Sequence, residues 1–185
     1  LLGRLTRATV ASAIPGGVSQ TRASSFAYNA ANGLLTQEVI EPDNAALRLQ
    51  TDYAYDAFGN KTSVTVSGVD IATRTTRTAY DAQGRFPTSS SNALNQSETR
   101  VYDPRFGTMT SLTGPNNLTT QWAYDGFGRK VSEARADGTT TTVSYDWGGV
   151  GSYTVTTTSS GTSPATVHYD ILNREVRSEG QGFDG

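Results

Sequence analysis

Polar and apolar residues alternate along most of this chain. Thr120, Trp122 and Tyr124 lie on one side of an extended segment, and the same spacing recurs elsewhere with valine and alanine. A period of two with Thr, Val, Tyr and Trp is typical of β-strands, and no segment has a competing helical period. Residues 43–58 are therefore interpreted as strand as well. The segment 85–93, with a proline and a run of serines, is instead expected to be a bulge, an edge or a loop.

A tyrosine-aspartate pair returns about every 22 residues, and Tyr28-Asn29 reads as a weakened earlier copy. Glycine, or Asn173 in the last copy, follows the aspartate by three or four residues. The residues that define the repeat are Tyr55, Asp56, Gly59, Tyr80, Asp81, Gly84, Tyr102, Asp103, Gly107, Tyr124, Asp125, Gly128, Tyr145, Asp146, Tyr169 and Asp170. The closing "GFDG" at 182–185 reads as the front of another copy.

The residue types of this repeat predict a turn. An aspartate can accept hydrogen bonds from backbone N–H groups about two residues on, and glycine or asparagine supplies the positive φ that such turns need. A second turn then sends the chain back, at Asp137-Gly138 in one copy and at 114–117 and 91–96 in others. Two strands and two turns fill one period. The sequence thus predicts an all-β ribbon of antiparallel hairpins, with the pairs marking successive bends.

Composition narrows the possible functions. The 185 residues are 35% hydrophobic and 17% charged, which is lean for a thick two-layer core, so each hairpin is expected to depend on its neighbours. The net charge is −2 with no basic stripe, so nucleic acid is not an expected partner. No long apolar run predicts membrane insertion, and there is no cysteine for a disulfide or a thiolate metal site.

For the side chains that recur in every repeat, a structural role is favoured over a binding role. The tyrosines could form a binding stripe, but a ring at one position in every repeat is what stacks neighbouring hairpins. The aspartates lack the density of a calcium loop, so no metal and no cofactor are expected. Arg85, Arg129 and Arg174 are expected to pair with acidic groups on an adjacent hairpin.

The remaining chemistry is sparse. His168 is the single histidine and has no nearby carboxylate pair outside the repeat, which makes it a poor general base, so no enzyme is expected. Trp122 and Trp147 are the least repetitive aromatic residues and the best candidates for an additional role, although Trp122 shares the face of Tyr124 and is expected to be packed.

The repeats resemble the YD repeat of the RHS-repeat family. The segments "YDAFGNKTSVTV", "YDGFGRKVSEARADGTTTTVSYD" and "YDILNREVRSEG" carry the resemblance. The family includes bacterial Rhs polymorphic toxins, Tc toxin B and C components, wall-associated proteins and teneurins. The resemblance implies a continuous curved sheet of hairpins that is a segment of a spiralling β-shell. "VYDPRFGTMT" at 101–110 is similar to the first half of the family's self-cleavage signature, but the second half is absent, so Asp103-Pro104 is interpreted as an ordinary repeat turn.

The resemblance sets the functional expectations. Residues 1–185 are expected to form one YD/RHS repeat segment of about six to seven repeats, partial at both ends, from a larger protein. Its role would be to enclose a C-terminal toxin polypeptide until delivery. Its partners would be the rest of the shell, that polypeptide and subunits of a secretion machine or toxin complex, in a secreted or cell-surface bacterial protein. The alternative is an extracellular YD-repeat protein that binds glycans or proteins.

Overall fold

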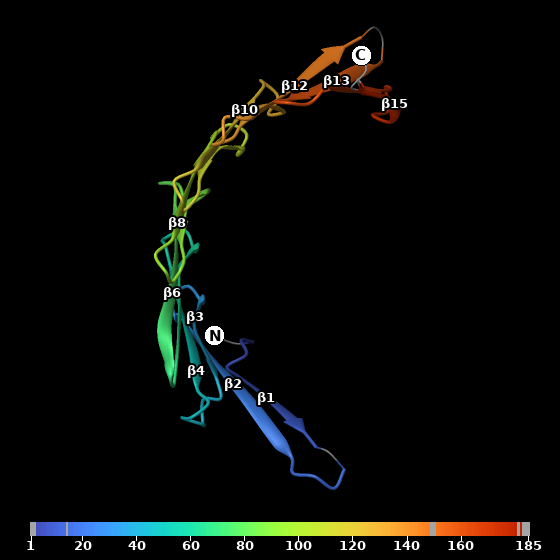
Figure 1. The fold of residues 1–185 in the computed structure, drawn as a ribbon. Helices are drawn as coiled ribbons and strands as arrows, with labels where there is room; N and C mark the ends of the chain where they lie inside the picture. The colour runs from blue at the N-terminus through green and yellow to red at the C-terminus, as the bar shows by residue number, and fades with distance from the viewer. Residues whose placement is uncertain (1–2, 14, 149–150, 181, 183–185) are drawn as a thin grey trace. The chain divides into compact units, whose positions relative to one another are not determined.

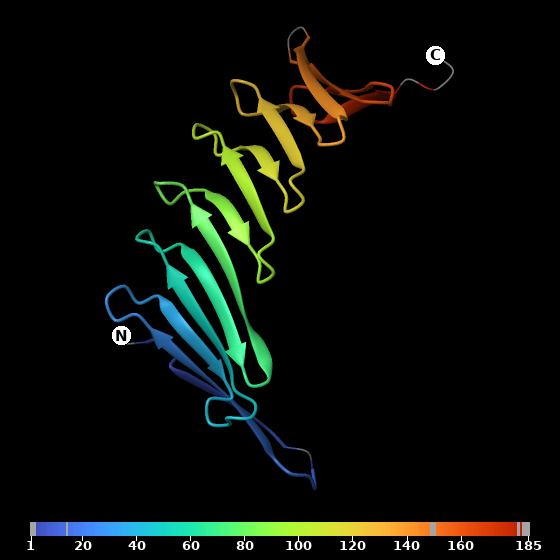
Figure 2. The same ribbon diagram turned by 60° about the vertical axis from the view of Figure 1, so that its left-hand side comes forward.

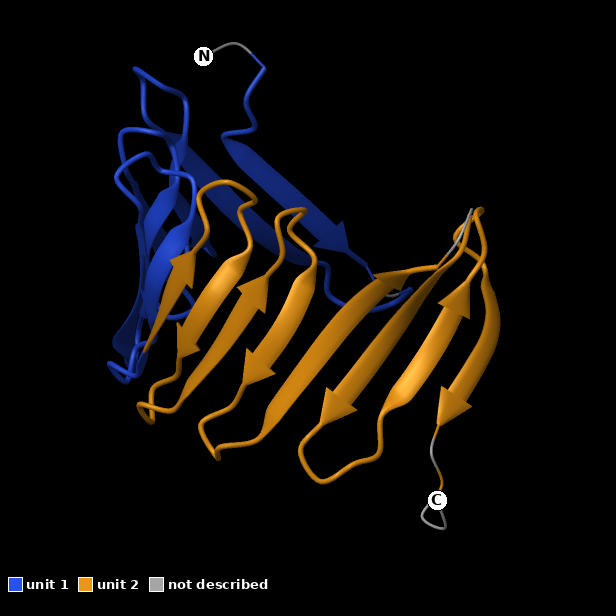
Figure 3. Cartoon of the chain, turned by 90° about the horizontal axis from the view of Figure 1, so that it is seen from above, with its two compact units in different colours: residues 1–97 blue, residues 98–185 orange. Residues whose placement is uncertain are grey.

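The protein consists of β-hairpins. The structure, a computed structural model, describes residues 3–13, 15–148, 151–180 and 182. These residues contain fifteen β-strands and no helix. The strands belong to two compact units, residues 1–97 and 98–185 (Figure 3). The expected all-β fold of antiparallel hairpins is thus confirmed; most of the closing copy expected at 182–185 lies outside the described residues.

In unit 1 the strands lie side by side in chain order, and each neighbouring pair is antiparallel (Figure 1). The strands of this unit are β1 (Arg7–Ser12), β2 (Gln20–Tyr28), β3 (Leu35–Ile40), β4 (Leu49–Tyr55), β5 (Lys61–Gly68), β6 (Ile71–Tyr80) and β7 (Pro87–Ser91).

Unit 2 repeats this organisation. Its strands also follow one another in chain order as antiparallel neighbours, with turns at both ends of the strands (Figure 2). The strands of this unit are β8 (Ser97–Tyr102), β9 (Met109–Thr113), β10 (Thr119–Tyr124), β11 (Lys130–Ala134), β12 (Thr140–Trp147), β13 (Tyr153–Ser159), β14 (Ala165–Tyr169) and β15 (Glu175–Gly180).

A β-bulge precedes the turn in six hairpins. The register shifts immediately before Tyr28, Tyr55, Tyr80, Tyr102, Tyr124 and Tyr169. The extra residue on the returning strand is threonine or valine at every one of these sites, for example Thr110. The Thr110 hydroxyl donates a hydrogen bond of 3.2 Å to the carbonyl of Val101. Bulges increase the local twist of a strand pair and redirect its side chains. The six tyrosines therefore share the same local backbone distortion.

The sheet has almost no buried core. Among the described residues only Ala23 and Val39 are buried hydrophobic residues, and most strand residues are half-buried at best. Hydroxyl pairs bridge neighbouring strands instead, as between Thr113 and Thr119 at 2.8 Å and between Thr156 and Thr166 at 2.9 Å. Cross-strand pairs of this kind stabilise a sheet locally, so the fold depends on strand-to-strand contacts.

The bulge expected within residues 85–93 is confirmed, because the register shifts between Ala79 and Tyr80 and leaves Thr88 as the extra residue. Residues 87–91 form β7 around it, and Pro87 is the first residue of that strand, where a missing N–H is tolerated. One expectation about strands was wrong. The strand expected from residue 43 begins only at Leu49. Asn44 closes a local turn before it, by accepting a hydrogen bond from the N–H of Ala46 at 3.1 Å.

Candidate functional site

The tyrosine-aspartate turns place one carboxylate over each bend, and Asp125 shows the arrangement. Its Oδ1 accepts hydrogen bonds from the backbone N–H of Phe127 and of Arg129, both at 2.9 Å. The N–H of Gly128 donates to the Asp125 carbonyl at 3.0 Å. Gly128 has φ +78°, which only glycine adopts without strain. The turn is therefore closed by its own aspartate and glycine.

The same closure recurs at four other pairs. Asp56 accepts from the N–H of Phe58 at 2.9 Å, Asp103 from that of Arg105 at 2.8 Å, and Asp170 from that of Leu172 at 2.9 Å. At Asp81 the N–H groups that close the turn are instead those of the fourth and fifth residues after it, Arg85 at 2.5 Å and Phe86 at 3.1 Å. Asn29, in the weakened copy, accepts from the N–H of Ala31 at 2.8 Å.

Asp146 departs from this pattern. It is a residue of β12 that pairs with Thr154 of β13, and the register through Tyr145 and Trp147 is regular. The prediction that every pair marks a bend is therefore wrong at 145–146. In this copy the strand continues to Trp147, because an alternating aromatic residue follows the aspartate where the other copies have turn residues.

The arginines pair within their own turns. Arg129 Nε lies 2.7 Å from Asp125 Oδ2, and Arg174 Nη2 lies 2.7 Å from Asp170 Oδ2. Arg85 Nη2 lies 3.3 Å from Asp81 Oδ2. The expectation that these arginines reach an adjacent hairpin was wrong, since the tight turn already brings the fourth residue after the aspartate back to its carboxylate.

These contacts lower the pKa of the turn aspartates. The pKa of Asp170 lies below its ordinary value, first because the Arg174 side chain donates to the carboxylate and then because the Arg174 N–H does. Arg105 lowers the pKa of Asp103 in the same order. At Asp125 desolvation raises the pKa, but the N–H groups of Arg129 and Phe127 outweigh it. The turns are thus built around ionised carboxylates.

We expect the protein to lose stability in acid. A carboxylate whose folded pKa is depressed stabilises the fold above its unfolded pKa of about 3.9, and this contribution disappears as the pH falls through the lower folded value. The thermal midpoint should stay level between about pH 7 and 5 and fall below about pH 4. In calorimetry, the thermal midpoint of a variant with both Asp103 and Asp170 replaced by asparagine should fall less below about pH 4 than that of the unmodified protein. A double variant that keeps the whole acid-induced loss would contradict the assignment.

Several of the tyrosines hydrogen-bond to the backbone of the preceding repeat. The hydroxyl of Tyr55 donates to the carbonyl of Leu35 at 2.8 Å, and that of Tyr124 donates to Met109 at 2.8 Å. These acceptors have a shared position, because each pairs with the tyrosine of the previous repeat. Tyr145 keeps the tie, to Lys130 at 3.4 Å, although its aspartate closes no turn. The tyrosine of a pair can therefore hydrogen-bond to the preceding repeat even where its aspartate does not close a turn.

An aromatic residue of one turn covers the glycine of the next. A Cβ placed on Gly84 would lie 2.4 Å from Cδ2 and 2.5 Å from Cγ of Phe58, and one on Gly128 would lie 3.1 Å from Phe106. Sequence reasoning did not assign these phenylalanines. The signal was present, since the residue directly before the turn glycine is phenylalanine in "YDAFG", "YDPRFG" and "YDGFG".

The remaining candidates are His168 and the two tryptophans. His168 Nε2 lies 2.8 Å from Glu179 Oε1 on the neighbouring strand. No group of three or more His, Cys, Asp or Glu side chains in the described part of the chain could hold a metal ion. Trp122 is half-buried on the face of Tyr124, whereas Trp147 is 64% exposed.

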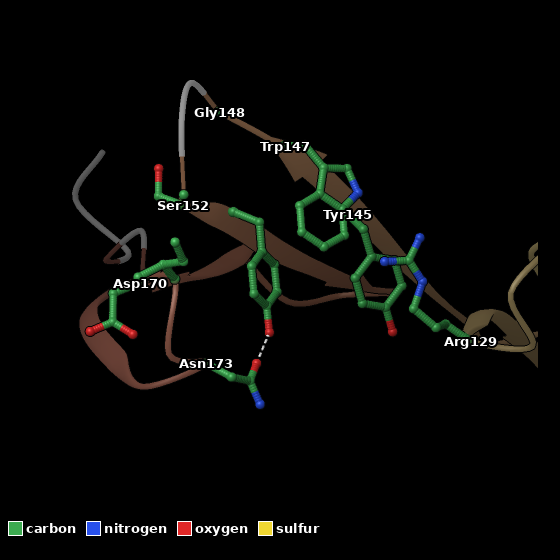
Figure 4. Close-up of a pocket in the computed structure, with 10 residues that line it drawn as sticks. Arg129, Tyr145, Trp147, Gly148, Ser152, Asp170 and Asn173 are labelled. Atoms are coloured by element: carbon green, nitrogen blue, oxygen red, sulfur yellow. Dashed lines mark hydrogen bonds between the residues drawn. The ribbon is translucent and has the colours of Figure 1, made fainter.

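Trp147 borders a cavity of about 520 Å³ in unit 2 (Figure 4). Tyr145, Tyr153 and Asn173 also line it. The guanidinium carbon of Arg129 lies 4.2 Å from the centroid of the Tyr145 ring and 5.6 Å from that of Trp147. The cavity therefore combines flat aromatic faces with a few polar groups, as small ligand sites do.

Comparisons with known proteins agree with this geometry. Residues 99–140 match the family model described as RHS Repeat. A crystal structure of TcdB2-TccC3-Cdc42 is similar with a TM-score of 0.50 and 14% identity over 93% of this chain. The Tc holotoxin pore of Photorhabdus luminescens, with a mutated TccC3, is similar with a TM-score of 0.51 and 13% identity over 94% of this chain. In both cases the match covers 11% of the other chain.

No curated protein sequence matches the chain. None of the described segments is a helix that could cross a membrane. The chain therefore contains an RHS repeat at residues 99–140, and its all-β fold is that of the matching part of the Tc toxin structures.

Proposed function

We propose that this chain is a wall segment of an Rhs or Tc-type toxin shell, which encloses a C-terminal toxin polypeptide until delivery. The observation that carries the proposal is the repeated tie between hairpins, in which a tyrosine hydroxyl binds the backbone of the preceding repeat. A wall needs such ties because it must be extended by adding equivalent units.

The energetics favour a wall over a self-contained domain. A lone hairpin is marginal in water, and only two hydrophobic residues of the described part are buried. Each added repeat contributes cross-strand pairs, and several repeats also contribute a tyrosine hydrogen bond or a covered glycine, so stability grows with the number of neighbours. A sheet of this kind can become large while it stays one layer thick.

The similar structures support the kind of role. They are a TcdB2-TccC3 complex and a Tc holotoxin pore, and the present chain spans 11% of the length of the matching chains. By analogy, residues 1–185 would be one YD-repeat segment of a longer protein. Its partners would be the rest of the shell, the enclosed polypeptide and other toxin-complex subunits, in a secreted complex. Its contribution would be mechanical, with no catalytic step of its own.

Limited proteolysis of the full-length protein tests enclosure. The polypeptide that follows the repeats should resist a protease while the native protein is intact and be digested once the repeats are unfolded. The same polypeptide expressed without the repeats serves as the control and should be digested at once. Equal digestion rates with and without the repeats would overturn the proposal, as would a reading frame that ends without any such polypeptide.

A further inference from the structure

The turn between β2 and β3 contains an asparagine-glycine step, Asn32-Gly33, whereas every other asparagine of the chain precedes a residue with a side chain. Such a step can react with itself. The Gly33 nitrogen attacks Cγ of Asn32, an N–Cγ bond forms, and the side-chain nitrogen leaves as ammonia with the Gly33 proton. Water then opens the resulting succinimide to aspartate or isoaspartate. Glycine favours the attack because it has no Cβ to block the approach, and the reaction is intramolecular.

The folded turn keeps both reacting groups engaged. The Gly33 N–H donates to the Asn29 carbonyl at 2.8 Å, so the nitrogen retains its proton. Oδ1 of Asn32 accepts from the N–H of Leu34 at 3.0 Å, which holds the side chain in an Asx turn. Attack requires a nitrogen without its proton and a side chain that is free to rotate onto it. The reaction therefore proceeds only after the turn has opened.

Residues 4 and 5 cover this turn. The Arg4 guanidinium occupies the space beside Gly33, since a Cβ built on Gly33 would lie 2.5 Å from Cζ and 2.9 Å from Nη1 of Arg4. Gly33 is consequently buried, although Asn32 is exposed. Arg4 Cζ also lies 5.1 Å from the centroid of the Tyr28 ring, and the Tyr28 hydroxyl donates to the carbonyl of Leu5 at 3.0 Å. These contacts hold the covering segment, residues 4–5, against the closed turn.

Aspartate-glycine steps can form the same ring, but they are poorer candidates. At Asp137-Gly138 the hydroxyl and the N–H of Thr139 donate to the carboxylate, at 2.6 and 2.9 Å, and lower its pKa. Asp125, which precedes another glycine, has a lowered pKa as well. An ionised carboxylate resists the attack, because its charge repels the nucleophile and its oxygen is a poor leaving group. At neutral pH Asn32 is therefore the reactive position.

We propose that Asn32 is a deamidation site whose reaction is gated by the docking of the covering segment on the turn. The closed turn does not react, so the observed rate is the rate of the open turn multiplied by the fraction of molecules in which the turn is open. The Tyr28 hydrogen bond exists only in the closed form, so its loss raises that fraction. The inference does not rest on the proposed wall function, because the reaction needs only water.

The isoaspartate product would weaken the junction of β2 and β3. It adds one carbon atom to the backbone between residues 32 and 33, within a turn that the Asn29 N–H and the Leu34 carbonyl close at 2.8 Å. The longer backbone misaligns this pair. Because the loss of ammonia is irreversible in water, a deamidated Asn32 marks molecules in which the covering segment has undocked.

Peptide mapping by mass spectrometry tests the proposal. The full chain is incubated in mildly alkaline water that carries a heavy oxygen isotope, which enters at Asn32 only when the succinimide opens. Asn32 should react more slowly than in a synthetic peptide of residues 28–36, which has no covering segment. Tyr28→Phe should speed the reaction about two- to tenfold, the range expected for one lost hydrogen bond. Arg4→Ala, which uncovers the glycine, should speed it too.

Tyr124→Phe is the matched control, because it removes an equivalent hydrogen bond of 2.8 Å in unit 2 and should leave the rate at Asn32 unchanged. Deamidation of Asn95, in another exposed turn, should stay constant in all variants. An equal rise at Asn95 would assign the effect to global unfolding and contradict a local gate.

The proposal fails if Asn32 reacts in the folded chain as fast as in the peptide, or reacts in neither. It also fails if Tyr28→Phe and Arg4→Ala leave the rate unchanged or lower it while circular dichroism shows that both variants are folded. Failure of the proteolysis test for enclosure would leave all of these expectations in place, so the two proposals are tested separately.

Discussion

Gly84→Ala is expected to destabilise the protein by roughly 2–5 kcal/mol. Two costs add at this position. Gly84 has φ +67°, a conformation that costs an alanine about 1–2 kcal/mol. The new Cβ would also lie 2.4–2.9 Å from three atoms of Phe58, including its Cβ and Cγ, so the whole side chain would have to move. Urea unfolding of the protein measures the loss.

Gly138 supplies the control for backbone strain. It has φ +84°, but nothing lies within 4 Å of a Cβ built there, so Gly138→Ala should cost only the strain term. Phe58→Ala should reduce the cost of Gly84→Ala to that of Gly138→Ala, since the clashing ring is gone. If Gly84→Ala costs no more than Gly138→Ala, or if Phe58→Ala leaves its cost unchanged, the contact between the two turns is not energetically significant.

Tyr124→Ala is expected to cost roughly 2–4 kcal/mol, because it removes a half-buried ring and its tie to Met109 at 2.8 Å. Tyr124→Phe keeps the ring and should cost about 0.5–1.5 kcal/mol, the usual net value of one hydrogen bond. Both losses can be measured by denaturant unfolding.

Tyr169→Phe is the matched control for the hydroxyl. The Tyr169 ring stacks on Tyr153 with centroids 4.8 Å apart, but its hydroxyl makes no hydrogen bond within the described part of the chain. Its removal should change stability by less than about 0.5 kcal/mol. A Tyr124→Phe variant as stable as Tyr169→Phe would show that the hydroxyl tie contributes nothing.

The sequence predicts the turns well because their chemistry is local. An aspartate, a glycine three or four residues later and alternating strands on either side specify a closed bend, and Asp56 and Asp125 have this geometry. The pairing of Arg129 was mispredicted although it is local too, since only the tightness of the turn shows that the fourth residue faces the carboxylate.

Contacts between repeats could not be predicted from the repeat alone. The bulge before Tyr124 depends on register, which the period does not specify, and the acceptor at Met109 depends on the bulge of the preceding hairpin. Residues 145–146 resemble a turn in sequence, yet pairing with β13 continues through both. The exposed Trp147 beside the cavity follows from that continued pairing, so no pattern within one copy indicates it.

Amide hydrogen exchange of Tyr124→Phe most directly tests whether neighbouring repeats brace one another. The account predicts faster exchange in β9, which contains the acceptor Met109, as well as near residue 124, while β14 and β15 keep their native protection. Faster exchange confined to the turn at residues 125–129, with β9 unchanged, would contradict it.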